Sequence, residues 1–269
     1  MKRGHWLLAT VLATAPVYVW MGRRMVDGSD EPWGLLAAAT GIGLVVAKHK
    51  PAPPHASLVA PGIVLALYAV SYTMALPLVR AVLATITSSL LLSRLYLGRR
   101  FDLGLTGLCL LTLPLSASLH FFVGYPLRAL VARLAALALN AGGLAVSARG
   151  VGLEWGAQLV VVDAPCSGIK MLWVGAFVTC ALSVALDLSL RRCLLAGLGA
   201  LIVIVGGNAL RAAALFYSEA GLVAIPRWAH DAAGLAVFAG IAASIAALTL
   251  HLAPPRRPSS TMPCSEPST

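Results

Sequence analysis

The chain has 269 residues, of which 59% are hydrophobic and 11% are charged, and its 20 Lys and Arg residues outnumber its 10 Asp and Glu residues. Soluble globular domains carry about 25% charged residues, so this composition excludes a soluble domain and indicates a polytopic membrane protein. The net charge of +10 does not indicate a nucleic-acid-binding protein, because the basic residues fall in twos and threes between apolar runs.

The cysteines indicate neither a metal site nor a disulfide framework. They lie at positions 109, 166, 180, 193 and 264, without a CxxC pair and without a histidine at the spacing of a metal ligand. We therefore expect no metal and no cofactor, and any cysteine chemistry would come from one thiol.

The apolar runs predict an all-α fold, an integral membrane bundle with about eight transmembrane helices. A span needs about 20 predominantly apolar residues. The predicted cores are 6–21, 33–47, 58–78, 80–97, 103–122, 167–186, 193–216 and 232–252. The first is interpreted as a helix and not as a signal peptide, because Arg23, Arg24 and Met25 follow it without a small-residue cleavage site.

Three regions are expected along the chain. Residues 1–122 hold the N-terminal transmembrane helices, 123–252 hold an outer interfacial segment and the last three spans, and the Pro- and Ser-rich end, 253–269, is expected to be a disordered cytoplasmic tail. Between 127 and 138 apolar residues recur at helical spacing, which predicts a helix in the membrane interface with its apolar side in lipid. Gly142 and Gly143 end this helix, and 153–162 is compatible with a short extended stretch.

The distribution of Lys and Arg predicts the orientation, because cytoplasmic loops hold the excess of these residues. With the N-terminus inside, eleven of them are cytoplasmic and seven are outside, and Lys170 and Arg211 remain within or at the edge of spans. The cytoplasmic set comprises Lys2, Arg3, Lys48, Lys50, Arg94, Arg99, Arg100, Arg191, Arg192, Arg256 and Arg257.

Polar residues in three places are candidates for a site, because charges inside a bilayer are costly and usually functional. The first is the run 163–170, DAPCSGIK, in which Pro165 suits the first turn of a helix. Cys166 is then expected at or just inside a helix N-terminus, where the dipole stabilises a thiolate. Lys170 lies one turn further on the same face and could add positive charge near the sulfur.

The other two places lie at the same predicted leaflet. Asn208 precedes Arg211 by three residues, so the two share a helix face. Arg211 is expected about five residues from the outer end of its span, roughly 7 to 8 Å deep. His230 and Asp231 are expected just before the last span.

Each of these residues also has a structural interpretation. A membrane cysteine can be a small apolar filler, a histidine can be solvated or a cap, a lysine can snorkel, and an aspartate can be stabilised by a helix N-terminus. These interpretations apply to Cys166, His230, Lys170 and Asp231. Arg211 could pair with Glu219 or Asp163.

Together, Cys166, Arg211 and His230 would form a cysteine acyl-transfer site. A thiolate attacks an amide carbonyl, a histidine protonates the leaving amine, and an arginine stabilises the oxyanion or fixes the substrate. The product would be a thioester, which water or another nucleophile resolves.

At these motifs the sequence resembles the exosortase/archaeosortase family of membrane transpeptidases, over roughly residues 120–252. The resemblance is carried by Cys166-Ser167-Gly168, by Asn208-Ala-Leu-Arg211, and by His230-Asp231 with Gly234, in that order, and by the upstream Tyr125-Pro126-Leu127-Arg128. It implies that Cys166 is the nucleophile, Arg211 the transition-state or substrate-binding arginine, and His230 the acid/base. Pro165, where many members have a small residue, points to a divergent subgroup.

The resemblance also implies a cellular setting. Family members act at the outer face of the cytoplasmic (inner) membrane on exported proteins with a C-terminal motif, a transmembrane helix and a basic cluster, of which PEP-CTERM is one kind. The expected partners are such proteins and membrane lipids, and no nucleic acid.

Three alternatives remain open. Ser167 could be the nucleophile instead of Cys166. The chain could be a transporter or channel in which Arg211 and Lys170 line an anion path, although no inverted repeat is seen. It could also be a non-catalytic scaffold of an exopolysaccharide or envelope assembly.

Overall fold

The computed structural model describes residues 3–26, 33–50, 57–161, 168–223 and 226–255, and in that part of the chain it has eleven helices and one small sheet. The fold is all-α, as predicted. The helices are α1 (Arg3–Ala13), α2 (Ala15–Val26), α3 (Trp33–Ala47), α4 (Val59–Met74), α5 (Pro77–Leu95), α6 (Leu103–Leu110), α7 (Ser116–Phe122), α8 (Gly124–Ala141), α9 (Ile169–Ala185), α10 (Leu190–Glu219) and α11 (Arg227–His251). The strands are β1 (Ser147–Arg149), β2 (Gly152–Trp155) and β3 (Gln158–Val161).

The predicted count of about eight spans is not confirmed. Among the described residues, three helices are long and apolar enough to cross a membrane, namely Pro77–Leu95, Leu190–Glu219 and Gly234–His251. Two sharply bent helix pairs, α1 with α2 and α7 with α8, raise the number to five if each pair is one span. Three further apolar helices, α3, α4 and α9, have 15, 16 and 17 residues and are shorter than these three.

Two predicted spans are interrupted. The helix expected at 6–21 bends by 64° between α1 and α2, where Thr14 bonds back to the carbonyl of Thr10 and Pro16 supplies no backbone N–H. The helix expected at 103–122 stops at Leu110, and Pro114 lies in the break before α7 begins. Continuous hydrophobicity did not reveal these breaks.

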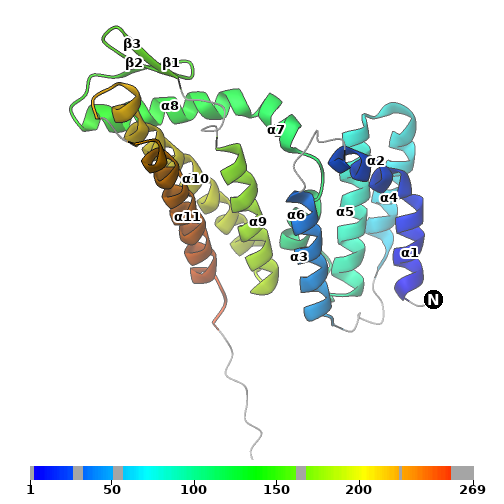
Figure 1. Cartoon of the computed structure of the whole chain (residues 1–269). Helices are drawn as coiled ribbons and strands as arrows, with labels where there is room; N and C mark the ends of the chain where they lie inside the picture. Colours follow the sequence, from blue (N-terminus) through cyan, green and yellow to red (C-terminus); the bar gives the residue numbers. More distant parts are fainter. Residues whose placement is uncertain (1–2, 27–32, 51–56, 162–167, 224–225, 256–269) are drawn as a thin grey trace, which may run out of the picture.

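Successive long helices run in opposite directions, so α3, α5 and α9 all start at one end of the bundle (Figure 1). At the opposite end, the Lys50 amide donates to the carbonyl of Tyr96, just after α5. The Lys48 ammonium, just after α3, donates to the carbonyl of Val184 in the last turn of α9. Because α10 runs back from this end, Arg211 and the start of α11 lie at the same end as the start of α9.

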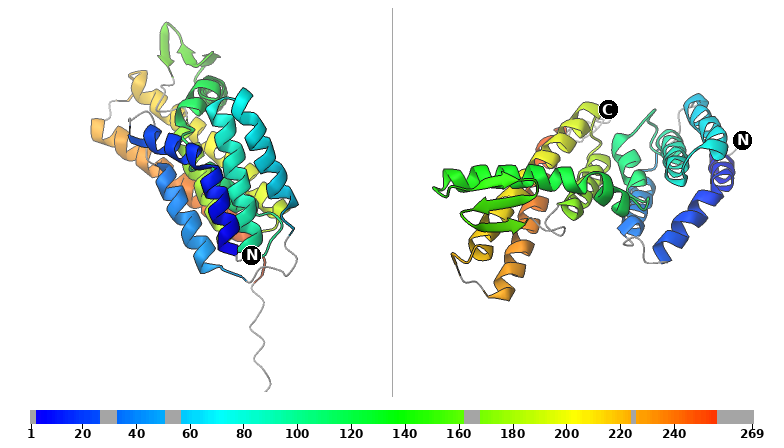
Figure 2. Two further views of the ribbon diagram at one scale, coloured as in Figure 1. Left: turned by 90° about the vertical axis from the view of Figure 1, so that its right-hand side faces the viewer. Right: turned by 90° about the horizontal axis from the view of Figure 1, so that it is seen from above.

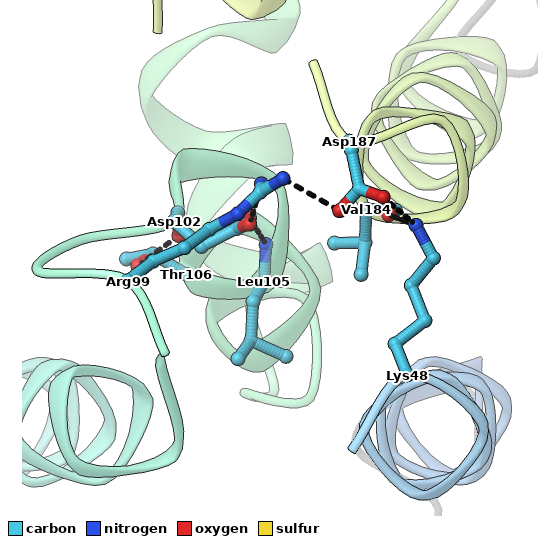
Figure 3. Close-up of polar contacts among 7 residues, drawn as sticks. All are labelled: Lys48, Arg99, Asp102, Leu105, Thr106, Val184 and Asp187. Atoms are coloured by element: carbon cyan, nitrogen blue, oxygen red, sulfur yellow. Dashed lines mark hydrogen bonds and ion pairs between the residues drawn. The ribbon is translucent and has the colours of Figure 1, made fainter. Parts of the chain in front are cut away.

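Charged side chains connect α3, the loop before α6 and the loop after α9 at the end where α3, α5 and α9 finish (Figure 3). The Asp187 carboxylate lies 2.6 Å from the Lys48 Nζ and 2.5 Å from the Arg99 Nη2. Arg99 also pairs with Asp102 at 2.6 Å, and Asp102 caps α6 by accepting from the Leu105 amide. Residues just after α3, in the loop between α5 and α6, and in the loop after α9 are therefore held together.

The segment between α7 and α9 forms a cover over the other end (Figures 1 and 2). A helix was predicted here, and α8 is that helix. Its apolar side packs on α10 instead of facing lipid alone: Val131 and Ala135 are buried in one cluster with Phe216 of α10. Other apolar residues of the helix, such as Leu137, are exposed.

The predicted extended stretch is two strands of an antiparallel sheet with the order β1-β2-β3. Gly156, with φ +59°, makes the turn between β2 and β3. The Asn140 side chain ties the end of α8 to this sheet, because its amide donates to the carbonyl of Val146 and its carbonyl accepts from the Val146 amide, both at 2.9 Å.

Candidate functional site

The first motif leads into α9 through Gly168. Cys166 and Ser167 lie outside the described residues, and Gly168 is the N-cap residue of the helix, with φ +77°. This left-handed conformation favours glycine. The helix begins at Ile169, three residues after Cys166, so the helix starts later than the expected position of Cys166 at or inside its N-terminus.

The second motif lies directly against the first. Asn208 of α10 is 2% exposed, and a Cβ placed on Gly168 would stand 2.8 Å from the Asn208 Nδ2. The Asn208 amide therefore occupies the space that any other side chain at position 168 would need. Although 40 residues separate the two in sequence, the Cys-Ser-Gly and Asn-x-x-Arg motifs meet at this contact.

Arg211 lies against the third motif. A Cβ placed on Gly234 of α11 would stand 3.2 Å from the Arg211 Nη2 and 3.7 Å from its Cζ. The guanidinium thus packs on the bare backbone of α11 one turn after position 230. Since positions 230 and 234 share a helix face, α11 presents position 230 on the side that meets Arg211.

His230 and Asp231 belong to the first turns of α11, which begins at Arg227. They precede the apolar part of the helix that is long enough to cross a membrane, Gly234–His251, while the helix itself starts earlier than this apolar run. Their side chains are not among those that the structure describes.

Arg211 has no carboxylate partner within the described part of the chain, and its buried Nε has no hydrogen-bond partner there. The pairing with Glu219 considered from the sequence is not formed, and Asp163 lies outside the described residues. α10 continues eight residues beyond Arg211, so the arginine lies about 12 Å from the helix end instead of the expected 7 to 8 Å. A half-buried guanidinium that no described carboxylate neutralises is suited to an anionic or partly anionic group.

Lys170 is exposed and lines a small cavity between α3, α7 and α9. Trp33 and Trp173 also line it, with their rings edge to face and 5.2 Å between centroids. Among the described residues that line it, Lys170 alone is charged. The described lining of the cavity is therefore largely apolar and aromatic apart from the Lys170 ammonium, and it includes Ile169, the residue that follows Gly168.

The two tryptophans were not predicted as site residues. Trp173 follows Lys170 by three residues, so helical spacing would have placed it on the same face. Trp33 gave no such signal, because it comes from a helix more than 130 residues earlier. Among the residues that the structure describes, no three His, Cys, Asp or Glu side chains are grouped to bind a metal ion.

Comparison with known proteins gives a family for this arrangement. No curated protein and no solved structure matches the chain significantly. A family model described as transmembrane exosortase matches residues 2–247, which includes the first helices as well as the region where the motifs were recognised. The chain is therefore a member of the transmembrane exosortase family.

Proposed function

We propose that the chain is an integral membrane cysteine protease and transpeptidase. It cleaves a C-terminal sorting signal of exported proteins through a thioester intermediate, and it releases or transfers them at the outer face of the cytoplasmic membrane. Family membership supports the membrane location and the general class of reaction.

One observation carries the proposal: residues from three separate motifs meet at one end of the bundle. Gly168 packs against Asn208 of α10. Gly234 packs against Arg211, which lies about one helical turn after Asn208 on the same helix. Convergence of motifs that are far apart in the sequence is what a catalytic site requires and what independent structural roles would not predict.

The chemistry follows from the residue types. The Cys166 thiolate attacks the scissile amide carbon, and the carbon–nitrogen bond breaks as His230 gives a proton to the leaving amine. A thioester then links Cys166 to the N-terminal part of the substrate. Water or an amine attacks this thioester, and the thiol is regenerated.

Arg211 is assigned to the oxyanion or to the substrate carbonyl, because its guanidinium has no carboxylate to neutralise it among the described residues. Asn208 is assigned a positioning role, because it is buried against Gly168 and lies three residues before Arg211 on the same helix. Ser167 and Asp231 are supporting residues by their place in the motifs.

Substrate enters, in this proposal, from the side of the cavity beside Lys170. The aromatic walls formed by Trp33 and Trp173 suit an uncharged segment of polypeptide, and the Lys170 ammonium gives the opening a positive charge.

The test compares four variants in cells that coexpress a protein with a C-terminal motif, a transmembrane helix and a basic cluster. Cys166→Ala is expected to abolish cleavage, while Ser167→Ala retains a measurable fraction. Cys193→Ala is the matched control, because this thiol is buried within α10. Arg211→Gln is expected to reduce cleavage by about 100-fold or more.

Each outcome separates the alternatives. Loss of cleavage in Ser167→Ala with full cleavage in Cys166→Ala would make the serine the nucleophile. Full cleavage in all four variants would contradict the enzyme assignment and favour a scaffold or transport role.

A further inference from the structure

A second cavity lies between α2, α4 and α5, away from the three motifs. Its lining residues are Pro16, Val17, Trp20, Tyr72, Pro77 and Arg80. Val17 is buried, whereas Pro16, Tyr72 and Pro77 are exposed, so the cavity is open on one side. Its walls are apolar and aromatic except for Arg80.

Arg80 is a cation without a counter-charge in the described part of the chain. No described carboxylate pairs with it, and its Nε is buried without a hydrogen-bond partner. Its Cζ lies 4.8 Å from the centre of the Tyr72 ring, which stabilises a guanidinium but does not neutralise it. An anion in the cavity would supply the missing counter-charge and could accept hydrogen bonds from the terminal nitrogens of the guanidinium.

The cavity lies where the headgroups of a bilayer are expected. α5 is one of the three helices that could cross the membrane on their own, and Arg80 is its fourth residue, about 5 Å from its start. Trp20 and Tyr72 are of the residue types that concentrate at the membrane–water interface. No acidic residue lies in the first turn of α5, so the dipole of this helix adds to the positive potential.

We propose that this cavity binds the phosphate of a membrane phospholipid. The Arg80 guanidinium donates hydrogen bonds to phosphate oxygens, a geometry for which arginine is better suited than lysine. The apolar wall formed by Pro16, Val17 and Trp20 contacts the glycerol and the upper acyl chain. Free phosphate shares the anionic chemistry but would leave this wall uncovered.

The test measures thermal unfolding of the full chain purified in detergent. Three additives are titrated: dioleoyl phosphatidylglycerol, dioleoylglycerol, which has the same chains without the phosphate, and inorganic phosphate. Phosphatidylglycerol is expected to raise the Tm of the natural protein, and the other two to have little effect. Arg80→Gln is expected to need about tenfold more phosphatidylglycerol for the same shift.

The matched control is Arg133→Gln, which removes an exposed arginine of α8 outside the cavity. It is expected to respond like the natural protein. Arg80→Lys is expected to lie between the natural protein and Arg80→Gln, because it keeps the charge and loses the planar pair of donors. If Arg80→Gln does not fold, Arg80→Lys and Trp20→Leu carry the test, and both must need more lipid.

Three results would overturn the proposal. Equal responses of Arg80→Gln and Arg133→Gln to phosphatidylglycerol would remove the arginine from the site. An equal shift with dioleoylglycerol would show that the phosphate is not recognised. An equal, Arg80-dependent shift with inorganic phosphate would show a free-anion site and not a lipid site.

Discussion

Gly168 connects the cysteine motif to Asn208, and its substitution tests that contact. Gly168→Ala must adopt φ +77°, at a cost of about 1 to 2 kcal/mol, and its new Cβ must also displace the Asn208 amide, which lies 2.8 Å from it. We expect a clear loss of thermal stability and a loss of cleavage of a coexpressed substrate.

Gly221→Ala is the matched control for this prediction. Gly221 has a similar conformation, with φ +70°, but a Cβ placed there would meet no atom within 4 Å. It should therefore show the conformational cost alone and retain cleavage. If the two variants behave alike in both measurements, the Gly168–Asn208 contact does not matter to the site.

Gly234 tests the placement of Arg211 in the same manner. An alanine in a helix interior is about 1 kcal/mol more favourable than glycine, and the Cβ of Gly234→Ala would press on the flexible end of Arg211 at 3.2 Å. We expect stability to change little, because the guanidinium can shift by a few tenths of an ångström. Cleavage should fall about tenfold, because a displaced guanidinium no longer fits the transition state.

Gly240→Ala on the same helix supplies the comparison, since no atom lies within 4 Å of a Cβ at that position. It should raise the Tm and leave cleavage unchanged. Unchanged cleavage in both variants would indicate that Arg211 does not act where it lies in this structure.

Between elements, Asp187 is the residue that ties the loop after α9 to α3 and α6. Burial tends to raise the pKa of its carboxyl, but the Lys48 hydrogen bond and the charges of Arg99, Lys48 and Lys50 outweigh burial and hold the pKa below its usual value. A lowered folded-state pKa stabilises the protein above the unfolded pKa of 3.8 and loses this effect as pH falls through the folded value.

Asp187→Asn measures that contribution with the backbone unchanged. Asp187 has φ 56°, a conformation that asparagine also tolerates. We expect the natural protein to be more stable than the variant by at most about 1 kcal/mol at pH 7, because the carboxylate is partly exposed. The difference in Tm should shrink below about pH 4. A difference that is constant from pH 7 to pH 3 would show that the ion pairs contribute nothing.

The sequence predicted several elements well and others poorly, for physical reasons. The predicted core 33–47 coincides with α3, because polar and charged residues bound this apolar run on both sides and so mark its ends. The helix predicted at 103–122 ends at Leu110, and the sequence did not reveal the break that contains Pro114, since a hydropathy average hides a single residue that cannot continue a helix. β1 was missed altogether, because three residues with mixed burial carry no period.

The candidate site was predictable as a set of motifs but not as a set of contacts. Helical spacing alone places Asn208 and Arg211 on one face. No local pattern indicates that Asn208 meets Gly168 or that Arg211 meets Gly234, because these contacts depend on how α9, α10 and α11 cross. The start of α11 at Arg227 was also missed, since charged residues in its first turns interrupt the apolar signal.

For the whole molecule, the arrangement of helices separates two chemically different ends. One end holds Asp187 and basic residues that are predicted to be cytoplasmic, such as Lys48, Arg99 and Arg191. Gly168, Arg211 and the cover formed by α8 and the sheet lie at the opposite end. If basic loops stay in the cytoplasm, the candidate site faces outward.

Two single-cysteine variants test this orientation in intact cells. One retains only Cys166 and the other only Cys264, with the remaining cysteines changed to serine. A membrane-impermeant maleimide added outside should label Cys166 directly and should reach Cys264 only after permeabilisation, because the C-terminal tail is predicted to be cytoplasmic. A permeant maleimide confirms that each thiol can react. Labelling of Cys264 but not Cys166 from outside would reverse the topology, and with it the side of the membrane on which the proposed reaction occurs.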